Sequence, residues 1–539
     1  GSARDRAGSA GALSWYERAA ELSGDPAAKA RRLSLAAEAA TESGDLDRAR
    51  TLAAQGLGLA GPPAPPGGTA GAGGDPPTVA RLWQAQATVA FLRGDTGTAH
   101  RRLIEAGELI APADQEQAAL LLVEAVHFGW YTGERELAES VARLERLDAA
   151  KGPLPRLVLR AVAPILGRTP DRSDPGAALA EARRAAAGNA PGLVLASGLA
   201  LILGDDRTAL QICDELGRDL RASGRIGLLP SLLFYAGYVQ AISGRHDRAR
   251  PTVEEGIRLA RDTGQQRWAE ALAEPLALLA AAGGDRELCQ RVVDEALGRS
   301  SDPAWNVPWT AAALGLLELG LGRAEAALAR LETLAEGRRF FHIPPTRSTP
   351  DLVEAAVRVG RPEAAEAPLA LFETWSANIA QPWAAALAHR CRGLLTGDED
   401  HFRAALSRHE DGDRPFDEAR TRLVYGEWLR RDKRKADARI HLGIAMETFE
   451  RIGAAPWADR ARSELTATGT TTRPAWRGPA GNLTPQELQI VRLAARGASN
   501  KDIAAQLILS PRTVGHHLYK AYPKLGVTSR AELAGLDLD

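Results

Sequence analysis

A glycine followed by a polar residue recurs along most of this chain, and each copy lies between two Ala- and Leu-rich stretches with helical spacing. From the middle of the chain onward, consecutive glycines are separated by 40, 40, 38, 38 and 37 residues. These are Gly204, Gly244, Gly284, Gly322, Gly360 and Gly397. Related segments begin at Ser43, Arg93 and Thr132. A period of this length in helical sequence predicts a repeat array and not one compact core.

Each repeat predicts two antiparallel helices joined at the glycine. Glycine ends a helix through its permissive backbone, and the polar pair after it begins the next helix. One hairpin cannot bury the apolar faces of both its helices, whereas stacked hairpins share a continuous core. The spacing resembles that of degenerate tetratricopeptide repeats. We therefore predict an all-α fold in which residues 1–465 form a tetratricopeptide-like α-solenoid, with one eroded copy near 164–187.

Two segments interrupt the helical pattern. Residues 61–78 are rich in Pro and Gly, and they predict a disordered loop between repeats. Residues 466–482 are rich in Thr, Gly and Pro without an apolar period, and they predict a flexible linker. The charge also changes beyond this linker. Residues 473–539 contain nine basic and five acidic residues although the whole chain has a net charge of −1, so any anion binding is expected at the C-terminus.

The last 57 residues contain four helix-start patterns in close succession. The expected N-cap residues are Thr484, Ser499, Ser510 and Ser529. In the third helix, apolar residues recur at core spacing; they are Val514, Leu518, Ala521 and Leu525. Two short helices joined by a tight turn, the second with a polar and basic outer face, predict a helix-turn-helix.

The outer face of the third helix combines basic, polar and aromatic side chains. It consists of Arg512, His516, Tyr519, Lys520 and Pro523, flanked by Thr513, His517 and Lys524. A solvated basic helix in an ordinary helical domain is the alternative explanation. We favour nucleic-acid binding because the order of the helices, their caps and their charge agree.

The segment LTPQELQIVRLAARGASNKDIAAQLILSPRTVGHHLYKAYPKLGVTSRAEL, residues 483–533, closely resembles the LuxR-type DNA-binding domain. The resemblance implies a small four-helix helix-turn-helix domain over 483–539, with backbone contacts from 499–503 and a recognition helix at 510–524. The DNA-binding residues that it implies are Asn500, Lys501, Ser510, Arg512, Thr513, Val514, His516, His517, Lys520 and Lys524. Its fourth helix would mediate dimerisation through Arg530, Leu533 and Leu536.

Two residues depart from this family's pattern. Gly515 stands where the family usually has a lysine, which removes one basic contact. Pro523 lies near the end of the recognition helix, so we expect a distorted last turn and an altered direction of Lys524.

A helical-repeat region ahead of such a domain is similar to the large MalT-like regulators of the LuxR family, which also carry an N-terminal ATP-binding domain. These residues contain no phosphate-binding loop, because no Gly-Lys dipeptide occurs. With the Gly-Ser start, this indicates a truncated form of a longer regulator, a naturally short form being the alternative. The excess of Arg over Lys and the many Ala residues suggest an actinobacterial regulator of secondary metabolism, by analogy alone.

An aromatic cluster in the repeat region is a candidate effector pocket. It comprises Trp305, Trp309, Phe340, Phe341, Trp375 and Trp383. Packing between repeats is the simpler explanation for such residues, and we prefer it. Pro308 suggests that the first two tryptophans stand at the entry to a helix.

Searches for other chemistry give no candidates. No serine-nucleophile elbow, zinc-protease motif or dinucleotide-binding glycine pattern occurs. Cys213, Cys289 and Cys391 are too far apart in sequence to suggest a disulfide framework or a zinc site. The longest apolar stretch, 192–204, is too short to cross a bilayer, and no secretion signal begins the chain. We therefore expect a cytoplasmic protein that is no enzyme, needs no cofactor in these residues and has no membrane partner.

The leading hypothesis is a transcriptional regulator that binds double-stranded promoter DNA as a homodimer. Its repeats would receive a small-molecule or protein effector, and RNA polymerase is a further candidate partner. The alternative is a scaffold whose repeats bind proteins and whose DNA-binding module is autoinhibited or incidental.

Overall fold

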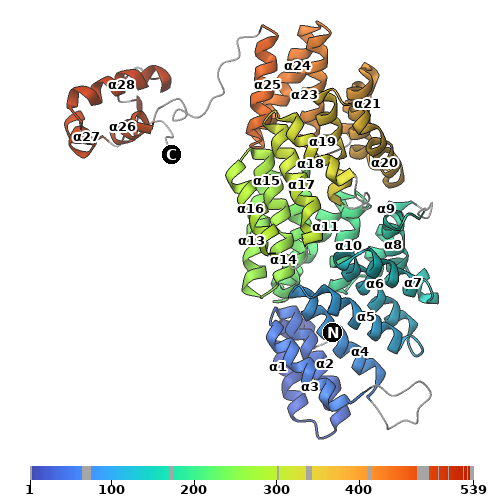
Figure 1. Ribbon diagram of the computed structural model, residues 1–539. Helices are drawn as coiled ribbons and strands as arrows, with labels where there is room; N and C mark the ends of the chain where they lie inside the picture. The colour runs from blue at the N-terminus through green and yellow to red at the C-terminus, as the bar shows by residue number, and fades with distance from the viewer. Residues whose placement is uncertain are drawn as a thin grey trace. The chain divides into compact units, whose positions relative to one another are not determined.

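The computed structural model describes residues 3–62, 74–168, 174–299, 303–335, 343–410, 412, 414–469, 485–495, 497–507, 509–525, 527, 529–530 and 532–533. Within these ranges the secondary structure is helical, without a β-strand. The chain forms two compact units, Gly1–Glu464 and Leu465–Asp539, which are considered separately. The fold class is thus all-α, as predicted, and the larger unit is a stack of helical hairpins (Figure 1).

The helices of the first half of the array are α1 (Ala3–Glu21), α2 (Pro26–Ser43), α3 (Leu46–Ala60), α4 (Pro76–Leu92), α5 (Thr96–Ile110), α6 (Gln115–Thr132), α7 (Glu134–Leu144), α8 (Pro153–Val162), α9 (Pro175–Ala185), α10 (Ala190–Ile202), α11 (Asp206–Ala222), α12 (Leu229–Ser243) and α13 (His246–Asp262). Short 3-10 turns lie at η1 (Asp148–Lys151), η2 (Ala163–Leu166) and η3 (Ile226–Leu228). The second half contains α14 (Gln266–Ala271), α15 (Ala273–Gly283), α16 (Arg286–Arg299), α17 (Pro303–Gly320), α18 (Ala324–Ala335), α19 (Ile343–Val359), α20 (Glu363–Ile379), α21 (Pro382–Thr396), α22 (Glu399–His409), α23 (Pro415–Arg431), α24 (Lys435–Arg451) and α25 (Ala455–Ala467).

The periodic glycines form the turns between paired helices, as the spacing predicted. All six, from Gly204 to Gly397, have a left-handed backbone with φ between 70° and 85°. After several of these turns an aspartate caps the second helix; for example, the Asp205 carboxylate accepts a hydrogen bond from the Thr208 amide. The predicted eroded copy at 164–187 contains α9, which packs against α8; α8 itself ends at Val162, before the predicted segment.

The sequence analysis missed one hairpin, α23 with α24. Its turn residue is Lys433, which has the same left-handed backbone, with φ of 64°. A search for repeated glycines cannot find such a turn. The array therefore continues past Gly397, and its last helix, α25, ends at Ala467, two residues beyond the predicted end of the array. Residues 470–484 lie outside the described part of the chain.

The predicted loop at 61–78 requires a second correction. Pro76 and Pro77 begin α4, and the Asp75 carboxylate accepts a hydrogen bond from the Thr78 amide. Proline is accepted in the first helical turn because the amide it lacks would have no helical partner there. The Gly- and Pro-rich residues 63–73 lie outside the described residues.

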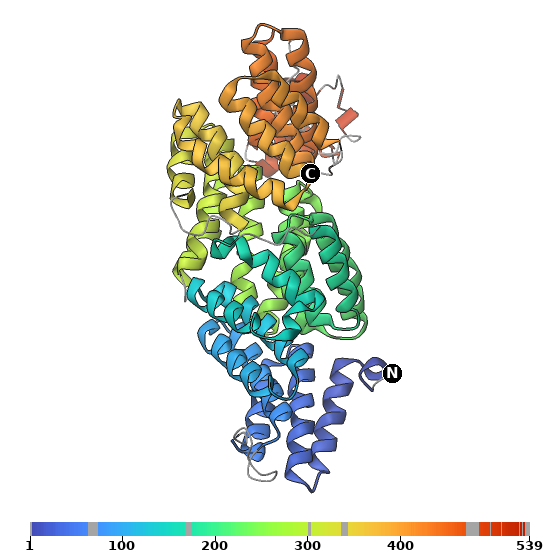
Figure 2. The same ribbon diagram turned by 90° about the vertical axis from the view of Figure 1, so that its right-hand side faces the viewer.

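Hairpin turns also pack against helices that come much later in the chain. A Cβ atom on Gly204 would lie 2.6 Å from Ile379 Cδ1, and one on Gly244 would lie 2.8 Å from the Phe416 nitrogen. Near the start of the array, Arg225 pairs with Glu42 across 183 residues. The array therefore coils so that segments about 175 residues apart touch, and in both views its helices run in order from the blue end to the orange end (Figures 1 and 2).

One segment of the described chain, Ile226–Ser243, is long and apolar enough to cross a bilayer by length and composition. Its mean hydropathy is 1.4, and 78% of it is buried inside the array. It comprises η3 and α12, where Leu232 and Val239 are in the core. This burial is typical of a central helix in a repeat array.

Candidate nucleic-acid interface and array cavities

Among its described residues, the C-terminal unit contains the helices α26 (Pro485–Ala495), α27 (Asn500–Leu507) and α28 (Pro511–Leu525). The start of α27 is a reciprocal capping box. The Ser499 amide donates to Asp502 Oδ2 at 3.0 Å, and the Asp502 amide donates to Ser499 Oγ at 3.3 Å. The Ser499 hydroxyl also donates to Asp502 Oδ2, at 2.5 Å, and this bond together with the one from the Ser499 amide lowers the pKa of Asp502. The local sequence thus sets the start of α27, as predicted.

The start of α28 is also capped as predicted, because the Thr513 amide donates to Ser510 Oγ at 3.0 Å. The two hydroxyl groups of Ser510 and Thr513 lie 2.7 Å apart. Between α27 and α28, the Leu509 amide donates to the Ala504 carbonyl. The chain therefore makes a tight turn between these two helices, and they pack closely.

Buried apolar side chains hold the three helices together. They include Ile490 and Val491 of α26, Ile503 of α27, and Val514 and Leu518 of α28. Val514 and Leu533 are fully buried in this core. That corrects two assignments, because a fully buried Val514 cannot contact a base and a fully buried Leu533 cannot contact a second subunit.

The opposite face of α28 is exposed. Arg512, His516, Lys520 and Tyr519 point to solvent, and Tyr519 is 76% exposed. Thr513 and His517 flank this face and are half-buried, while the side chain of Lys524 lies outside the described residues. The predicted outer face of the third helix is therefore a continuous polar and basic surface.

The predicted backbone-contact residues lie at the start of α27. Lys501 and Ser510 are exposed, whereas Asn500 is half-buried. Asn500 Oδ1 accepts a hydrogen bond from Arg530 Nη1 at 2.6 Å, and Arg530 Nη2 also donates to the Ala498 carbonyl. Arg530 thus links the end of the module to the start of α27, and its part in dimerisation stays a prediction. Leu536 and most of the predicted fourth helix lie outside the described residues; Glu532 and Leu533 form part of a 3-10 turn.

The two departures from the family pattern have different outcomes. A Cβ atom on Gly515 would have only Asn500 Nδ2 within 4 Å, at 3.6 Å, so a side chain fits there. Pro523 lies inside α28, and the helix continues to Leu525. The helix thus extends two residues past the proline, while the expected distortion of its last turn and the direction of Lys524 stay predictions.

The array contains an apolar cavity of about 910 Å³ that is partly open to solvent. Its walls come from α6, α8, α10, α12, α15, α17 and α19. Burial lowers the pKa of His127 to about 4 and raises that of Glu274 to about 8, so both side chains are neutral at pH 7. Tyr238 shares a hydrogen bond with Glu274. This cavity thus presents an apolar, aromatic surface with few polar groups.

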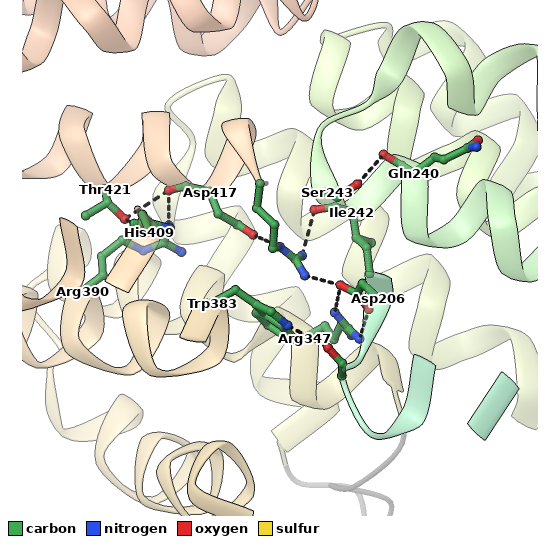
Figure 3. A network of polar contacts seen from close by, with 12 residues as sticks. Asp206, Gln240, Ile242, Ser243, Arg347, Trp383, Arg390, His409, Asp417 and Thr421 are labelled. Carbon is green, nitrogen blue, oxygen red and sulfur yellow. Dashed lines mark hydrogen bonds and ion pairs between the residues drawn. The ribbon is translucent and has the colours of Figure 1, made fainter. Parts of the chain in front are cut away.

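A second cavity, of about 740 Å³, adjoins the first, and Tyr238, Glu274 and Pro344 line both. Its other walls include four arginines: Arg347, Arg390, Arg414 and Arg420. Asp206 pairs with Arg347 at 3.0 Å and with Arg414 at 2.5 Å, and Arg414 reaches Asp417 at 2.8 Å (Figure 3). Trp383 lies under the guanidinium groups of Arg347 and Arg414.

Of the six predicted effector-pocket residues, the structure describes the side chains of Trp309, Trp375 and Trp383, and these three do not line the same cavity. Trp309 lines the apolar cavity and Trp383 lines the charged one, while Trp375 packs against Trp383 with ring centres 5.7 Å apart. Trp305 and Trp309 both lie in α17, which begins two residues before Trp305, so Pro308 is inside the helix and not at its entry. Phe340, Phe341 and the Trp305 side chain lie outside the described residues.

The sequence analysis missed the polar residues of these cavities. Glu274 and the arginines occur in ordinary helical sequence, and only the coiling of the array brings them together. The cysteines Cys213, Cys289 and Cys391 are free and buried, and burial raises the pKa of each thiol to about 12. In the described part of the chain, no group of three His, Cys, Asp or Glu side chains could hold a metal ion.

Comparison with known proteins assigns the C-terminal unit to a family. Residues 481–536 match the family described as bacterial regulatory proteins, luxR family, so this part of the chain is a LuxR-type helix-turn-helix domain. Curated proteins of Mycobacterium bovis and Mycobacterium tuberculosis, described by name as HTH-type transcriptional regulators, are 48% identical over 91 residues. Those residues are 17% of this chain and 9% of each relative.

Structural comparison gives more distant similarities to helical assemblies. A chain in the crystal structure of the APC/C hetero-tetramer Cut9-Hcn1 is 14% identical, with a TM-score of 0.41, over 84% of this chain and 93% of that one. A chain in the structure of Naa15/Naa10 bound to HypK-THB is 12% identical, with a TM-score of 0.21, over 90% of this chain and 80% of that one. The resemblance to MalT-like regulators stays a prediction.

Proposed function

We propose that this protein is a cytoplasmic transcriptional regulator that binds promoter DNA through the exposed face of α28. The supporting observation is the arrangement of α27 and α28, in which a capped, tightly packed helix pair presents Arg512, His516 and Lys520 on one solvent-facing surface. A recognition helix of this kind places such side chains at base edges in the major groove. Lys501, at the start of α27, would neutralise a backbone phosphate.

In this proposal the array receives an effector and controls the engagement of two DNA-binding modules with a two-fold site. We propose a homodimer on DNA whose half-sites are about 10 base pairs apart. With about three phosphates neutralised by each subunit, the slope of log K against log salt should be about −5. The protein would act through binding and not through catalysis.

The experiment compares promoter fragments that flank the protein's own gene with random DNA, using fluorescence anisotropy over a series of salt concentrations. Lys501→Ala should weaken binding to both DNAs alike and flatten the slope by about 1 per subunit. His516→Ala should weaken binding to the promoter by about 1 to 3 kcal/mol, with little effect on random DNA. Arg512 is the better second variant, because Thr513 belongs to the helix cap.

Lys151→Ala is the matched control, since Lys151 lies in the array and its side chain is 86% exposed. It should bind both DNAs like the wild type. If His516→Ala loses promoter and random DNA equally, the outer face of α28 is a basic patch without sequence specificity. The specific-regulator proposal then fails, and the scaffold alternative gains support.

A further inference from the structure

Of the four arginines that line the charged cavity, three are in ion pairs with carboxylates and Arg390 is not. In one ion-pair chain, Arg347 and Arg414 share Asp206 and Asp417. In a second chain, three arginines share three carboxylates; they are Arg358, Arg420 and Arg460 with Asp351, Glu354 and Glu427. Both chains are balanced if every group is charged. Arg390 belongs to neither.

Arg390 is only 1% exposed, and it lines the cavity. Its Nη1 donates to the Asp417 carbonyl at 3.3 Å, and its Nε has no hydrogen-bond partner among the described residues. No carboxylate in the described chain lies within 4.0 Å of its guanidinium. Figure 3 shows Arg390 beside Asp417 and His409. Arginine stays charged in proteins, so a buried positive charge is left without a counterion.

Neighbouring groups do not supply the missing negative charge. Burial lowers the pKa of His409 to about 4, so His409 is neutral, as is Glu274. Burial also raises the pKa of Glu427 to about 7, which leaves that carboxylate only partly ionised at neutral pH. The cavity therefore has a net charge of at least one positive unit near Arg390. An isolated buried charge is strongly unfavourable unless a counterion accompanies it.

The unpaired charge of Arg390 and the apolar residues in the cavity walls together indicate which kind of ligand the cavity would bind. One unpaired guanidinium can be neutralised by a singly charged carboxylate, which also accepts charge-assisted hydrogen bonds from it. The other walls of this cavity include Ile242, Leu316 and Phe416, and the apolar cavity adjoins it at Tyr238 and Glu274. We infer that the array binds a carboxylic acid with an apolar hydrocarbon part. Its carboxylate would pair with Arg390, and its hydrocarbon part would pack against the apolar residues of the cavity walls.

This inference deepens the proposed function and rests on it for the regulatory consequence, because such an acid would be the effector. Binding itself can be tested without DNA. The full chain is titrated by calorimetry and thermal unfolding with two matched pairs of probes: decanoate against decanamide, and 2-naphthoate against 2-naphthamide. Acetate serves as the head group alone.

Each acid should bind and raise the melting temperature, and its amide should bind about tenfold more weakly, because a charge-assisted hydrogen bond is roughly twice as strong as a neutral one. Acetate should give no shift. If neither acid binds at millimolar concentration, if the amides bind as well as the acids, or if acetate gives the same shift, the inference is wrong.

Arg390→Met tests the role of the surplus charge. It should weaken acid binding at least tenfold without lowering the melting temperature of the free protein, since it removes a charge that has no counterion. Arg390→Lys keeps the charge and should retain measurable acid binding. Arg420→Met is the matched control, because Arg420 is 3% exposed and its Nε also lacks a hydrogen-bond partner, but its guanidinium is ion-paired with Asp351 and Glu354, so its loss should lower the melting temperature.

If Arg390→Met lowers the melting temperature as much as Arg420→Met, or retains acid binding, Arg390 is a structural residue and the inference is overturned. A measurement of promoter binding by the wild type, with no acid or amide added, distinguishes failure of the proposed function from failure of the cavity inference. Loss of promoter binding would overturn the proposed function, and the result for the cavity would still stand.

Discussion

Replacing Glu274 with glutamine should change how the stability of the array depends on pH. Glu274 is 5% exposed, and its pKa is about 8 because burial penalises the charged form more than Tyr238 and Arg267 stabilise it. An unfolded glutamate has a pKa of 4.5. The folded carboxyl therefore keeps its proton over a range in which the unfolded one loses it. This contribution to stability is complete below about pH 4.5 and is lost as the pH rises towards 8.

The size of the effect follows from the two pKa values. One pKa unit corresponds to about 1.4 kcal/mol, so the loss at pH 7 amounts to about 3 kcal/mol. For an array of this length, unfolding as one block, that is a decrease of about 3 °C in melting temperature. Glu274→Gln cannot ionise, so its stability should lack this decline. Relative to Glu274→Gln, the stability of the wild type should fall by about 1 kcal/mol per pH unit at pH 5, by about 1.4 kcal/mol per unit near pH 6 to 7, and more slowly above pH 8.

Urea unfolding at half-unit steps from pH 5 to 8.5 measures this difference, with tryptophan fluorescence as the signal. The informative quantity is the change in the free energy of unfolding with pH. The glutamine amide also changes this free energy, but by the same amount at every pH. Glu287→Gln, in exposed α16 sequence, is the control and should follow the wild type. Parallel curves for Glu274→Gln and the wild type would refute a neutral Glu274 in the folded array.

Three further predictions concern single positions. Gly515→Lys should strengthen promoter binding and steepen the salt slope by about 1 per subunit, since the site has room for a side chain; an unchanged slope would show that it meets no phosphate. Gly227→Ala should destabilise the array by about 2 to 3 kcal/mol in urea unfolding, because its Cβ would overlap the Thr41 carbonyl oxygen, whereas Gly58→Ala, with open space around it, should not. Lys433→Gly should stabilise the array by about 0.5 to 1 kcal/mol, because only glycine adopts its left-handed backbone without strain; a loss of stability would argue against that backbone.

Local sequence was sufficient for much of the fold. The turn glycines, the cap at Ser499 and the core spacing of Val514 and Leu518 all depend on neighbours within a few residues, which is why they could be predicted. The hairpin at Lys433 was missed because a left-handed lysine has no sequence signature. Pro76 was misassigned because the proline-rich composition of the segment outweighed a local signal, an Asp75 N-cap followed by proline in the first helical turn.

The residues of the candidate sites likewise include some that local sequence could predict and some that it could not. The outward face of α28 follows from helical periodicity, so Arg512, His516 and Lys520 could be assigned from sequence. The assignment of Val514 came from the family segment and ignored that same periodicity. Arg390 could not be found from sequence, because its environment is made by Asp417 and Arg420, which belong to another hairpin of the array.

Contacts between segments about 175 residues apart limit how such a chain can gain or lose whole hairpins. With repeats of 37 to 40 residues, one coil of the array holds about four and a half hairpins. Deleting a single hairpin would displace every later one by about a fifth of a coil, and Gly204 would no longer face Ile379, nor Asp206 face Arg414. Open repeat proteins gain and lose units freely because each touches only its neighbours. Here the number of hairpins is fixed by contacts between successive coils, and insertions should be confined to loops that leave the coil in register.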